Sequence, residues 1–219
     1  MIATARTREQ RVTVMTATHH ATSTNWKSAL PVMAGTTFTM RELRIEDAPS
    51  LLAMLTTEEV SRFISPPPTT VEGFERFIAW TARQRKAGAY ACFAVTVDST
   101  DTAIGILQLR ELEPGFGTAE WGFAIGSAYW GTGVFQDGAE LMINFAFETV
   151  GVHRLEARAA VKNGRGNGAL RKVGAVQEGL LRKSFQKDGE YLDQALWTIL
   201  NEDWKPRQAW SAASRQIVH

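Results

Sequence analysis

The first third of the core sequence alternates between short apolar runs and helical stripes. Residues 37–42 have the alternation of a short strand, and Asp47 then stands where a helix cap is expected, with a proline two residues later. The run Ser65-Pro66-Pro67-Pro68 ends this helix. Thr69 and Glu72 have the spacing of a capping box, which predicts a second helix with an apolar stripe behind it.

The rest of the core pattern is richer in strands. The predicted strands are residues 90–97, 103–109, 118–125, 154–161, 175–186 and 191–200, and the predicted helices are residues 135–150 and 168–173. The first three of these strands are joined by short polar or glycine-bearing turns, which is typical of an antiparallel meander. The order predicts a single α/β (α+β) domain with a mixed, mostly antiparallel sheet of about seven strands flanked by about four helices.

The two ends of the chain lack this patterning. Residues 1–36 are rich in threonine and arginine and weakly resemble a transit peptide, although a non-native leader or a disordered extension fits the same composition. We therefore expect residues 1–36 to lie outside the core, residues 37–204 to form the domain, and residues 205–219 to be a C-terminal tail.

Composition narrows the classes of partner. The chain of 219 residues has a formal net charge of +1, so no general field attracts nucleic acid or an anionic membrane. No apolar run approaches the 18 or so residues of a membrane helix, and we expect a soluble, cytoplasmic protein. Cys92 is the only cysteine and lies in an apolar strand, which predicts a buried thiol, no internal disulfide and no metal site.

One predicted strand carries an acidic residue on a face that otherwise lacks bulk. In residues 118–125, Trp121, Phe123 and Ile125 alternate with Gly122 and Ala124. Glu120 belongs to the second set, and Gly126 continues it. A carboxylate on a face without large side chains leaves room for a ligand, although an ordinary exposed glutamate gives the same pattern.

The turn after this strand is suited to an anion. Gly131 and Gly133 directly precede the clearest helical pattern of the chain. Unpaired amides in a glycine turn at a helix N-terminus, together with the helix dipole, favour phosphate groups.

Together these segments resemble the Gcn5-related N-acetyltransferases (GNAT). The run Tyr129-Trp130-Gly131-Thr132-Gly133 is similar to their acetyl-CoA signature, and most similar to the branch that acetylates ribosomal-protein N-termini. The segment from Asn163 to Ala175 resembles that branch's next motif, and the resemblance covers residues 37–204 in the same element order. It implies the GNAT fold and acetyl-CoA as the donor.

The resemblance also implies a role for individual residues. The amides that would hold the CoA pyrophosphate are those of Gly131, Thr132, Gly133, Val134 and Phe135. The pantetheine arm would contact the backbone of Phe123, Ala124 and Ile125, together with Asn163. Glu120 would be the general base, acting through a water. The first two helices and the proline run would border the acceptor side.

Several positions depart from the family pattern. Trp130 stands at the signature's Gln or Arg position, and Phe135 replaces a small residue. Gly166 replaces a serine, and Leu170 stands where many of these enzymes have the tyrosine that reprotonates the CoA thiolate. Tyr191 is a candidate for that acid, although a buried strand tyrosine with a structural role fits the pattern as well.

The acceptor is an amine of undetermined identity. At neutral pH, deprotonating an α-amino group costs about 1 kcal/mol, against about 4 to 5 kcal/mol for lysine, which favours a protein N-terminus or another amine of low pKa. A small-molecule amine (a polyamine, an amino acid or an antibiotic) is the alternative acceptor. We expect the protein to be a monomer or a homodimer.

Two other readings of the same residues remain. The missing tyrosine and serine are compatible with a non-catalytic module that binds or senses acetyl-CoA. Residues 164–169 match a dinucleotide fingerprint, but the helix that follows is short and repeated βαβ units are lacking.

Overall fold

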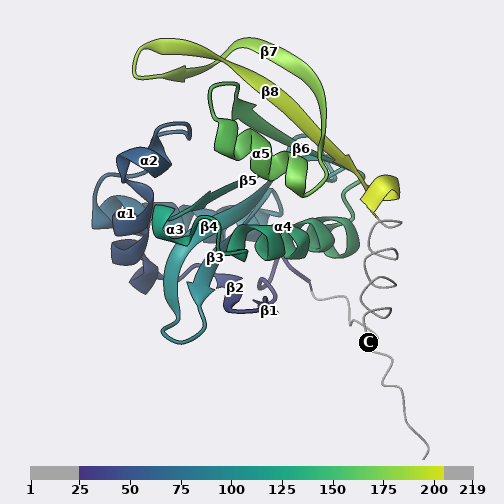
Figure 1. The fold of residues 1–219 in the computed structure, drawn as a ribbon. Helices are drawn as coiled ribbons and strands as arrows, with labels where there is room; N and C mark the ends of the chain where they lie inside the picture. Colours follow the sequence, from purple (N-terminus) through teal and green to yellow (C-terminus); the bar gives the residue numbers. More distant parts are fainter. Residues whose placement is uncertain (1–24, 205–219) are drawn as a thin grey trace, which may run out of the picture.

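The computed structural model describes residues 25–204 as one mixed sheet with helices on both faces (Figure 1). The strands are β1 (Met33–Ala34), β2 (Phe38–Glu42), β3 (Tyr90–Val97), β4 (Thr102–Glu111), β5 (Thr118–Ile125), β6 (Arg154–Ala160), β7 (Val176–Lys187) and β8 (Glu190–Leu200). The α-helices are α1 (Ala48–Leu55), α2 (Glu58–Ser61), α3 (Val71–Ala87), α4 (Val134–Asn144) and α5 (Gly164–Lys172), and a π-helical segment, Phe145–Val150, extends α4. This confirms the predicted fold class, with the two-residue β1 as an additional strand.

The sheet has the order β1-β2-β3-β4-β5-β6-β8-β7. Every neighbouring pair is antiparallel except β5 and β6, which run parallel. The chain between these two strands contains α4, as a parallel connection requires a crossover. The predicted meander is confirmed as β3, β4 and β5.

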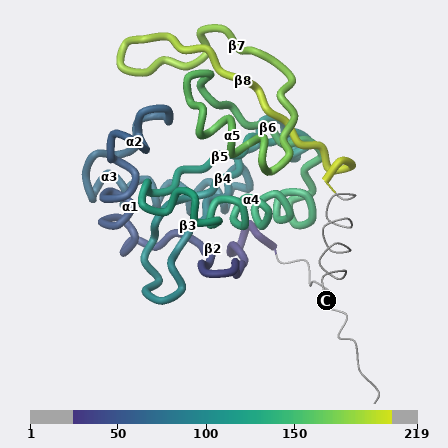
Figure 2. Tube along the Cα trace, in the orientation of Figure 1, coloured from purple at the N-terminus to yellow at the C-terminus, as the bar shows by residue number. Residues whose placement is uncertain are grey.

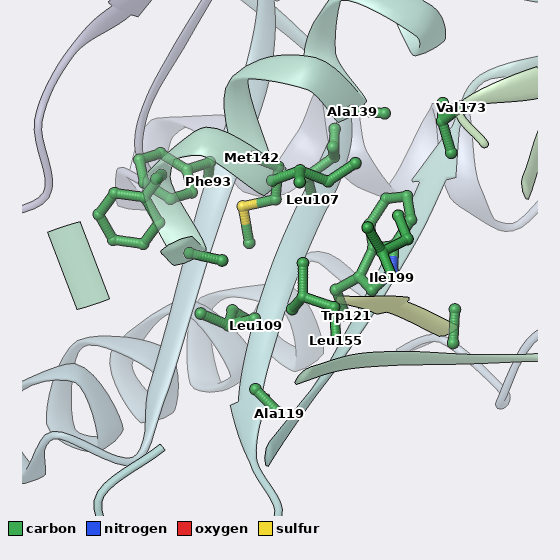
Figure 3. Close-up of a cluster of buried hydrophobic side chains, with 14 of the residues drawn as sticks. Phe93, Leu107, Leu109, Ala119, Trp121, Ala139, Met142, Leu155, Val173 and Ile199 are labelled. Carbon is green, nitrogen blue, oxygen red and sulfur yellow. The ribbon is translucent and has the colours of Figure 1, made fainter. Parts of the chain in front are cut away.

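Each face of the sheet has its own core. On one face α4 and α5 cover the larger core, where Met142 of α4 lies against Leu107 of β4 and Leu155 of β6 (Figure 3). On the other face α1, α2 and α3 cover a smaller core that includes Cys92 and Ala124. Burial raises the pKa of the Cys92 thiol to about 12, which confirms a buried, neutral cysteine.

Helix starts differ from the predictions in three places. Thr70, and not Thr69, caps α3, because its hydroxyl accepts a hydrogen bond from the Gly73 amide at 3.0 Å. Asp47 precedes α1 as expected, but its carboxylate binds Arg41 and does not cap the helix. The glycine-rich segment predicted as a turn before residue 168 is already helical, and α5 begins at residue 164.

Part of the predicted N-terminal extension belongs to the core. Trp26 and Leu30 are buried in the larger core, and β1 pairs with β2. The packed chain therefore begins earlier than residue 37. Residues 1–24 and the predicted tail at 205–219 lie outside the described residues, whereas Trp204 is buried.

The last two strands form a long hairpin at one end of the sheet. Strands β7 and β8 rise beyond the other elements, at the top of the view in Figure 2. Most of β7 is exposed, because β8 is its only neighbour in the sheet. No helix in the described part of the chain is both long and apolar enough to cross a membrane.

Candidate active site

The site lies where β5 and β6 separate. Their parallel register holds only from Thr118 opposite Arg154 to Glu120 opposite Glu156. Beyond Glu120, β5 continues to Ile125 and β6 to Ala160 without pairing to each other. The sheet therefore opens into a gap whose two walls are strand backbones.

The alternation of hydrogen bonds in β5 decides which backbone groups face this gap. The Gly126 amide donates to the Ile104 carbonyl of β4 at 2.8 Å, so the groups of Ala124, two residues earlier, also point to β4. The groups of Phe123 and Ile125 point to the gap. The Ile125 carbonyl accepts a hydrogen bond from the Trp130 indole at 2.8 Å. The N–H and C=O of Phe123 thus have no strand partner in the described chain.

The glycine turn lies at the end of this gap. Gly131 and Gly133 have φ values of 79° and 92°, a region that disfavours side chains, and no atom lies within 4 Å of where a Cβ would stand. Gly133 is the N-cap of α4 and has no side chain to satisfy the first amides. Thr132 turns its hydroxyl to the Tyr129 carbonyl at 2.8 Å. The first-turn amides of α4 are open to an anion.

The large residue at the end of the signature packs away from this turn. The ring of Phe135 lies 4.3 Å from the ring of Phe123, measured between centroids, and both pack on the larger core. Phe135 thus fills space between β5 and α4. Its backbone amide does not depend on whether the side chain is large or small.

Asn163 and Gly166 form the opposite wall at the start of α5. The Asn163 side-chain oxygen accepts a hydrogen bond from the Gly166 amide at 2.9 Å and caps the helix. A Cβ at Gly166 would lie 2.5 Å from the Asn163 amide nitrogen, so a larger residue at position 166 requires the Asn163 side chain to shift. Arg165 stacks over Trp130 at 4.3 Å and links α5 to the glycine turn across the gap.

A cavity of about 580 Å³ opens from this gap towards the face covered by α1 and α3. Its apolar wall includes Leu55, Phe63, Ile64, Pro66, Pro67, Pro68, Phe74, Phe77, Ile106, Trp121, Phe123, Leu170 and Phe185. Its polar groups are Ser65, Gln108, Arg110, Glu120, Arg158, Asn163 and Gln194. The side of β5 with small residues is open only in part, because Met54 fills the space beside Gly126.

Glu120 is the one carboxylate among the lining residues of the described chain. Its side chain is 22% exposed and is hydrogen-bonded to Arg110, its cross-strand neighbour on β4. The Nε of Arg158, on β6, lies 3.9 Å from the other carboxylate oxygen. A second buried polar pair lies close by, since the Tyr90 hydroxyl donates to Gln108 and burial raises the pKa of Tyr90.

Neither of the two positions considered for the thiolate acid places a proton donor in the cavity. Tyr191 is 54% exposed on β8, which excludes the buried strand tyrosine considered above, and it is absent from the cavity lining. Leu170 is buried in the larger core, 1% exposed, and borders the cavity as an apolar side chain.

Sequence reasoning missed Arg110 and Arg158. Arg154, Glu156 and Arg158 alternate with small and apolar residues along β6, a pattern that signals one polar face and could have identified that strand's contribution. The partnership of Arg110 with Glu120 depends on the register of β4 against β5, which the sequence does not give.

The sequence profile described as "Acetyltransferase (GNAT) domain" matches residues 37–176, more than half of the chain. The chain belongs to the GNAT acetyltransferase family. Members of this family use acetyl-CoA, and the chain is an N-acetyltransferase. No group of three or more His, Cys, Asp or Glu side chains that could hold a metal ion occurs within residues 25–204.

Curated GNAT relatives agree with this assignment. The chain is 25% identical over 167 residues to "Uncharacterized N-acetyltransferase p20" of Bacillus licheniformis, covering 76% of this chain and 94% of that protein. It is 25% identical over 122 residues to "[Ribosomal protein uS5]-alanine N-acetyltransferase" of Escherichia coli (strain K12), covering 55% of this chain and 63% of that protein.

Solved structures share the GNAT fold. The ribosomal-protein-S5-alanine acetyltransferase of Vibrio fischeri superposes with a TM-score of 0.72 at 19% identity, over 80% of this chain and 98% of that one. The structure described as "Mycobacterium smegmatis RimJ in complex with CoA-disulfide" superposes with a TM-score of 0.70 at 21% identity, over 78% of this chain and 85% of that one. At these identities the likeness establishes the fold.

Proposed function

We propose that the protein transfers the acetyl group of acetyl-CoA directly to a primary amine, without a covalent enzyme intermediate. The observation that carries the proposal is the gap between β5 and β6, which has a free strand edge at Phe123 and ends at an open glycine turn. The lone Cys92 is buried on the smaller core with a raised pKa, so it is a poor nucleophile for an acyl-enzyme. A cytoplasmic location is part of the proposal.

The donor fits the two ends of the gap. The amides from Gly131 to Phe135 would bind the pyrophosphate, because they combine unpaired donors with the positive end of the α4 dipole. The pantetheine arm of CoA, which carries amide groups, would pair with the backbone of Phe123 and lie against Asn163, which lines the cavity. The Ala124 backbone groups belong to the β4 ladder, and the Ile125 carbonyl already accepts from Trp130, so Phe123 is the principal partner.

The acceptor amine would reach the thioester from the cavity. An ammonium ion beside Glu120 loses a proton to the carboxylate, directly or through a water, and the neutral nitrogen then attacks the thioester carbon. A C–N bond forms, the C–S bond breaks and the thiolate leaves. The nitrogen, which is positively charged after the attack, loses its second proton to solvent. Arg110 holds the Glu120 carboxylate in place. Tyr191, exposed on β8, is poorly placed to reprotonate the thiolate, and solvent can supply that proton.

An α-amine is the favoured acceptor group. Its pKa is low enough for a single carboxylate to activate it at neutral pH. The relative named for alanine acetylation of ribosomal protein uS5 supports a protein N-terminus, whereas the apolar wall of the cavity also suits a small molecule.

Thermal unfolding with saturating acetyl-CoA tests donor binding. Ligand at 100 times its Kd stabilises the folded state by about 2.7 kcal/mol, which for this chain length raises Tm by about 5 to 10 °C. NAD and ATP serve as controls. An unchanged Tm with acetyl-CoA would remove the donor from the proposal, and a rise with NAD alone would restore the dinucleotide reading of residues 164–169.

Glu120→Gln tests the base. The amide keeps the shape of the side chain but cannot take a proton, so kcat should fall at least about tenfold while acetyl-CoA binding stays unchanged. Glu148→Gln, at an exposed position of the π-helical segment, is the matched control and should retain full activity. Turnover of the Glu120 variant at the unaltered rate would exclude this residue as the base.

A further inference from the structure

Arg158 is a cation of the cavity whose hydrogen-bond donors are unused. Its nearest carboxylate atoms lie 3.9 Å away on Glu120 and 3.8 Å away on Glu156, beyond hydrogen-bond distance. Its side chain is 38% exposed, lines the cavity, and donates no hydrogen bond to another described residue. A planar guanidinium with free donors in a cavity is suited to bind a carboxylate in a bidentate manner.

The neighbouring Arg154 shows the contrast on the same strand. Its Nε and Nη2 bind Glu156 and Glu178 at 2.9 and 2.6 Å, and it is absent from the cavity lining. Arg154 is therefore occupied by the protein itself. Of the two arginines of β6, Arg158 lines the cavity; it lies within ion-pair distance of Glu120 and Glu156 but makes no hydrogen bond to them.

The position of Arg158 separates it from the donor's phosphates. It lies two residues beyond Glu156, which is level with Glu120 in the parallel register. The part of β5 between Glu120 and Ile125 spans about 16 Å, and the glycine turn lies beyond it. Arg158 thus belongs to the end of the gap where the amine would react.

The charged groups of the cavity match a zwitterion. Glu120 can face an ammonium ion, and Arg158 lies beside it without a hydrogen bond joining the two side chains. Arg110 adds a second guanidinium at the same end. An α-amino acid carries its amine and its carboxylate on one carbon atom, so both charges reach adjacent protein groups together.

The remaining wall selects for an apolar substituent. The apolar residues that line the cavity include Phe63, Phe74, Phe77 and the proline run, and Phe185 comes from the β7–β8 hairpin. Desolvation by these rings strengthens the ionic contacts at the charged end.

We propose that the acceptor is a free α-amino acid with an apolar side chain, whose carboxylate is bound by Arg158. The inference rests on the proposed acetyl transfer and names its acceptor. A peptide N-terminus, in which this carboxylate is an amide, lacks the recognised group. Arg158 therefore determines specificity.

Matched acceptors test this assignment. L-Phenylalanine and L-leucine are compared with L-phenylalaninamide and L-leucinamide, and with tripeptides that begin with the same residues, by CoA release at saturating acetyl-CoA. The pH-independent kcat/KM is used, because a carboxylate raises the pKa of the adjacent ammonium. The free amino acids should be preferred by about tenfold or more, the size expected for a charge-assisted bidentate contact.

Variants of Arg158 separate recognition from folding. Arg158→Gln should abolish the preference for the carboxylate, because kcat/KM should fall by about tenfold more for the free amino acids than for the amides, and Arg158→Lys should retain part of the preference. Arg83 is an exposed arginine on α3 that does not line the cavity. Arg83→Gln removes the same charge and should change neither the preference for the carboxylate nor kcat/KM for the amides. A fold defect would lower kcat/KM for the free amino acids and for the amides by the same factor, so the ratio of the two values would be preserved.

The outcomes for the two proposals are distinct. Wild-type preference for amides or tripeptides, or an unchanged ratio in Arg158→Gln, would overturn the amino-acid assignment while leaving acetyl transfer intact. CoA release with another primary amine but with none of these would overturn the amino-acid assignment alone. CoA release with no amine of a broad panel, despite bound acetyl-CoA, would overturn both.

Discussion

At the scale of single residues, the start of α5 shows how a capping side chain occupies the space beside a glycine. The Asn163 side chain occupies the space that a Cβ at position 166 would need, and it uses that position to cap the helix. Gly166 and Asn163 therefore act as a pair. The other two glycines of this helix, Gly164 and Gly168, have no atom within 4 Å of the place a Cβ would take and carry no such constraint.

Alanine at these glycines should give effects of opposite sign. Gly166→Ala displaces Asn163 and removes its cap, which should lower the free energy of unfolding by about 1 kcal/mol. Gly168→Ala, in the helix interior with open space around it, should raise this free energy by up to about 1 kcal/mol. Urea unfolding of the two variants measures the difference, and equal effects would contradict the steric role of Asn163.

Sequence alone predicted residues whose role depends on local pattern. Cys92 lies in an apolar strand and is buried as predicted, and Trp121 and Ile125 belong to the larger core as their alternation required. Tyr191 shows the limit, because its exposure follows from the lack of a covering element over the hairpin and not from its neighbours in sequence. Contacts such as Met54 beside Gly126 depend on helix packing across the sheet.

At the scale of elements, Arg41 ties three segments together. It is 5% exposed on β2 and makes two hydrogen bonds of 2.8 Å to Asp47, ahead of α1. Its Nε also binds Asp101, in the turn between β3 and β4, at 2.7 Å. The hydrogen bond from Arg41 lowers the pKa of Asp101 below its ordinary value of 3.8. Asp47 is buried, so it depends on this partner.

Arg41→Met should lower the free energy of unfolding by about 3 to 5 kcal/mol, because it leaves Asp47 buried without its counter-ion. Arg44→Met, which removes a 56% exposed partner of the same Asp101, should change it by less than about 1 kcal/mol. Chemical denaturation at pH 7 compares the two variants. A similar loss in both would show that burial of the pair is not the source of the effect.

The same network predicts a dependence on pH. A carboxyl group whose pKa is lowered in the folded state stabilises the fold above its unfolded pKa, and this contribution is lost as the pH falls through the folded value. Asp101 should therefore contribute to a fall in stability below about pH 4. In Arg41→Met this acid-induced fall, followed by urea unfolding at a series of pH values, should be shallower.

Element types were more predictable than element partners. The strands, the long helix before residue 150 and the short helix after β6 follow from periodicity, whereas the start of α5 was missed because three glycines in nine residues resemble a turn. The parallel pairing of β5 with β6, which creates the gap, depends on contacts between segments separated by a whole helix. No local pattern encodes that register.

At the scale of the whole molecule, the N-terminal segment closes the larger core. Trp26 lies edge-on to Phe116 and Phe145, with ring centroids 5.6 and 6.4 Å away. Trp26→Ala should lower the free energy of unfolding by about 3 to 5 kcal/mol, whereas Val32→Ala, at a 71% exposed position of the same segment, should change it by less than about 0.5 kcal/mol. Thermal and urea unfolding of both variants tests whether residues 25–36 belong to the cooperative unit.

The sheet consists of two parts joined by little backbone pairing. Strands β1 to β5 and strands β6 to β8 meet through three registered residue pairs, and the shared core beneath them supplies most of the connection. In Figure 1, α5 lies near β6, and α4 lies below α5 beside β3 and β4. A ligand in this gap would contact both parts and add connections that the free protein lacks.

Hydrogen exchange can localise this bridging. With acetyl-CoA bound, amide exchange should slow most at Phe123 and at residues 131–135, because these amides would gain hydrogen-bond acceptors from the ligand. Strands β1 and β2 lie at the far edge of the sheet. Among amides that exchange by local opening, the amides of these two strands should show the smallest change in exchange rate. NAD serves as the control ligand. Equal protection of both regions would indicate general stabilisation, and protection confined to β7 and β8 would place the ligand outside the gap.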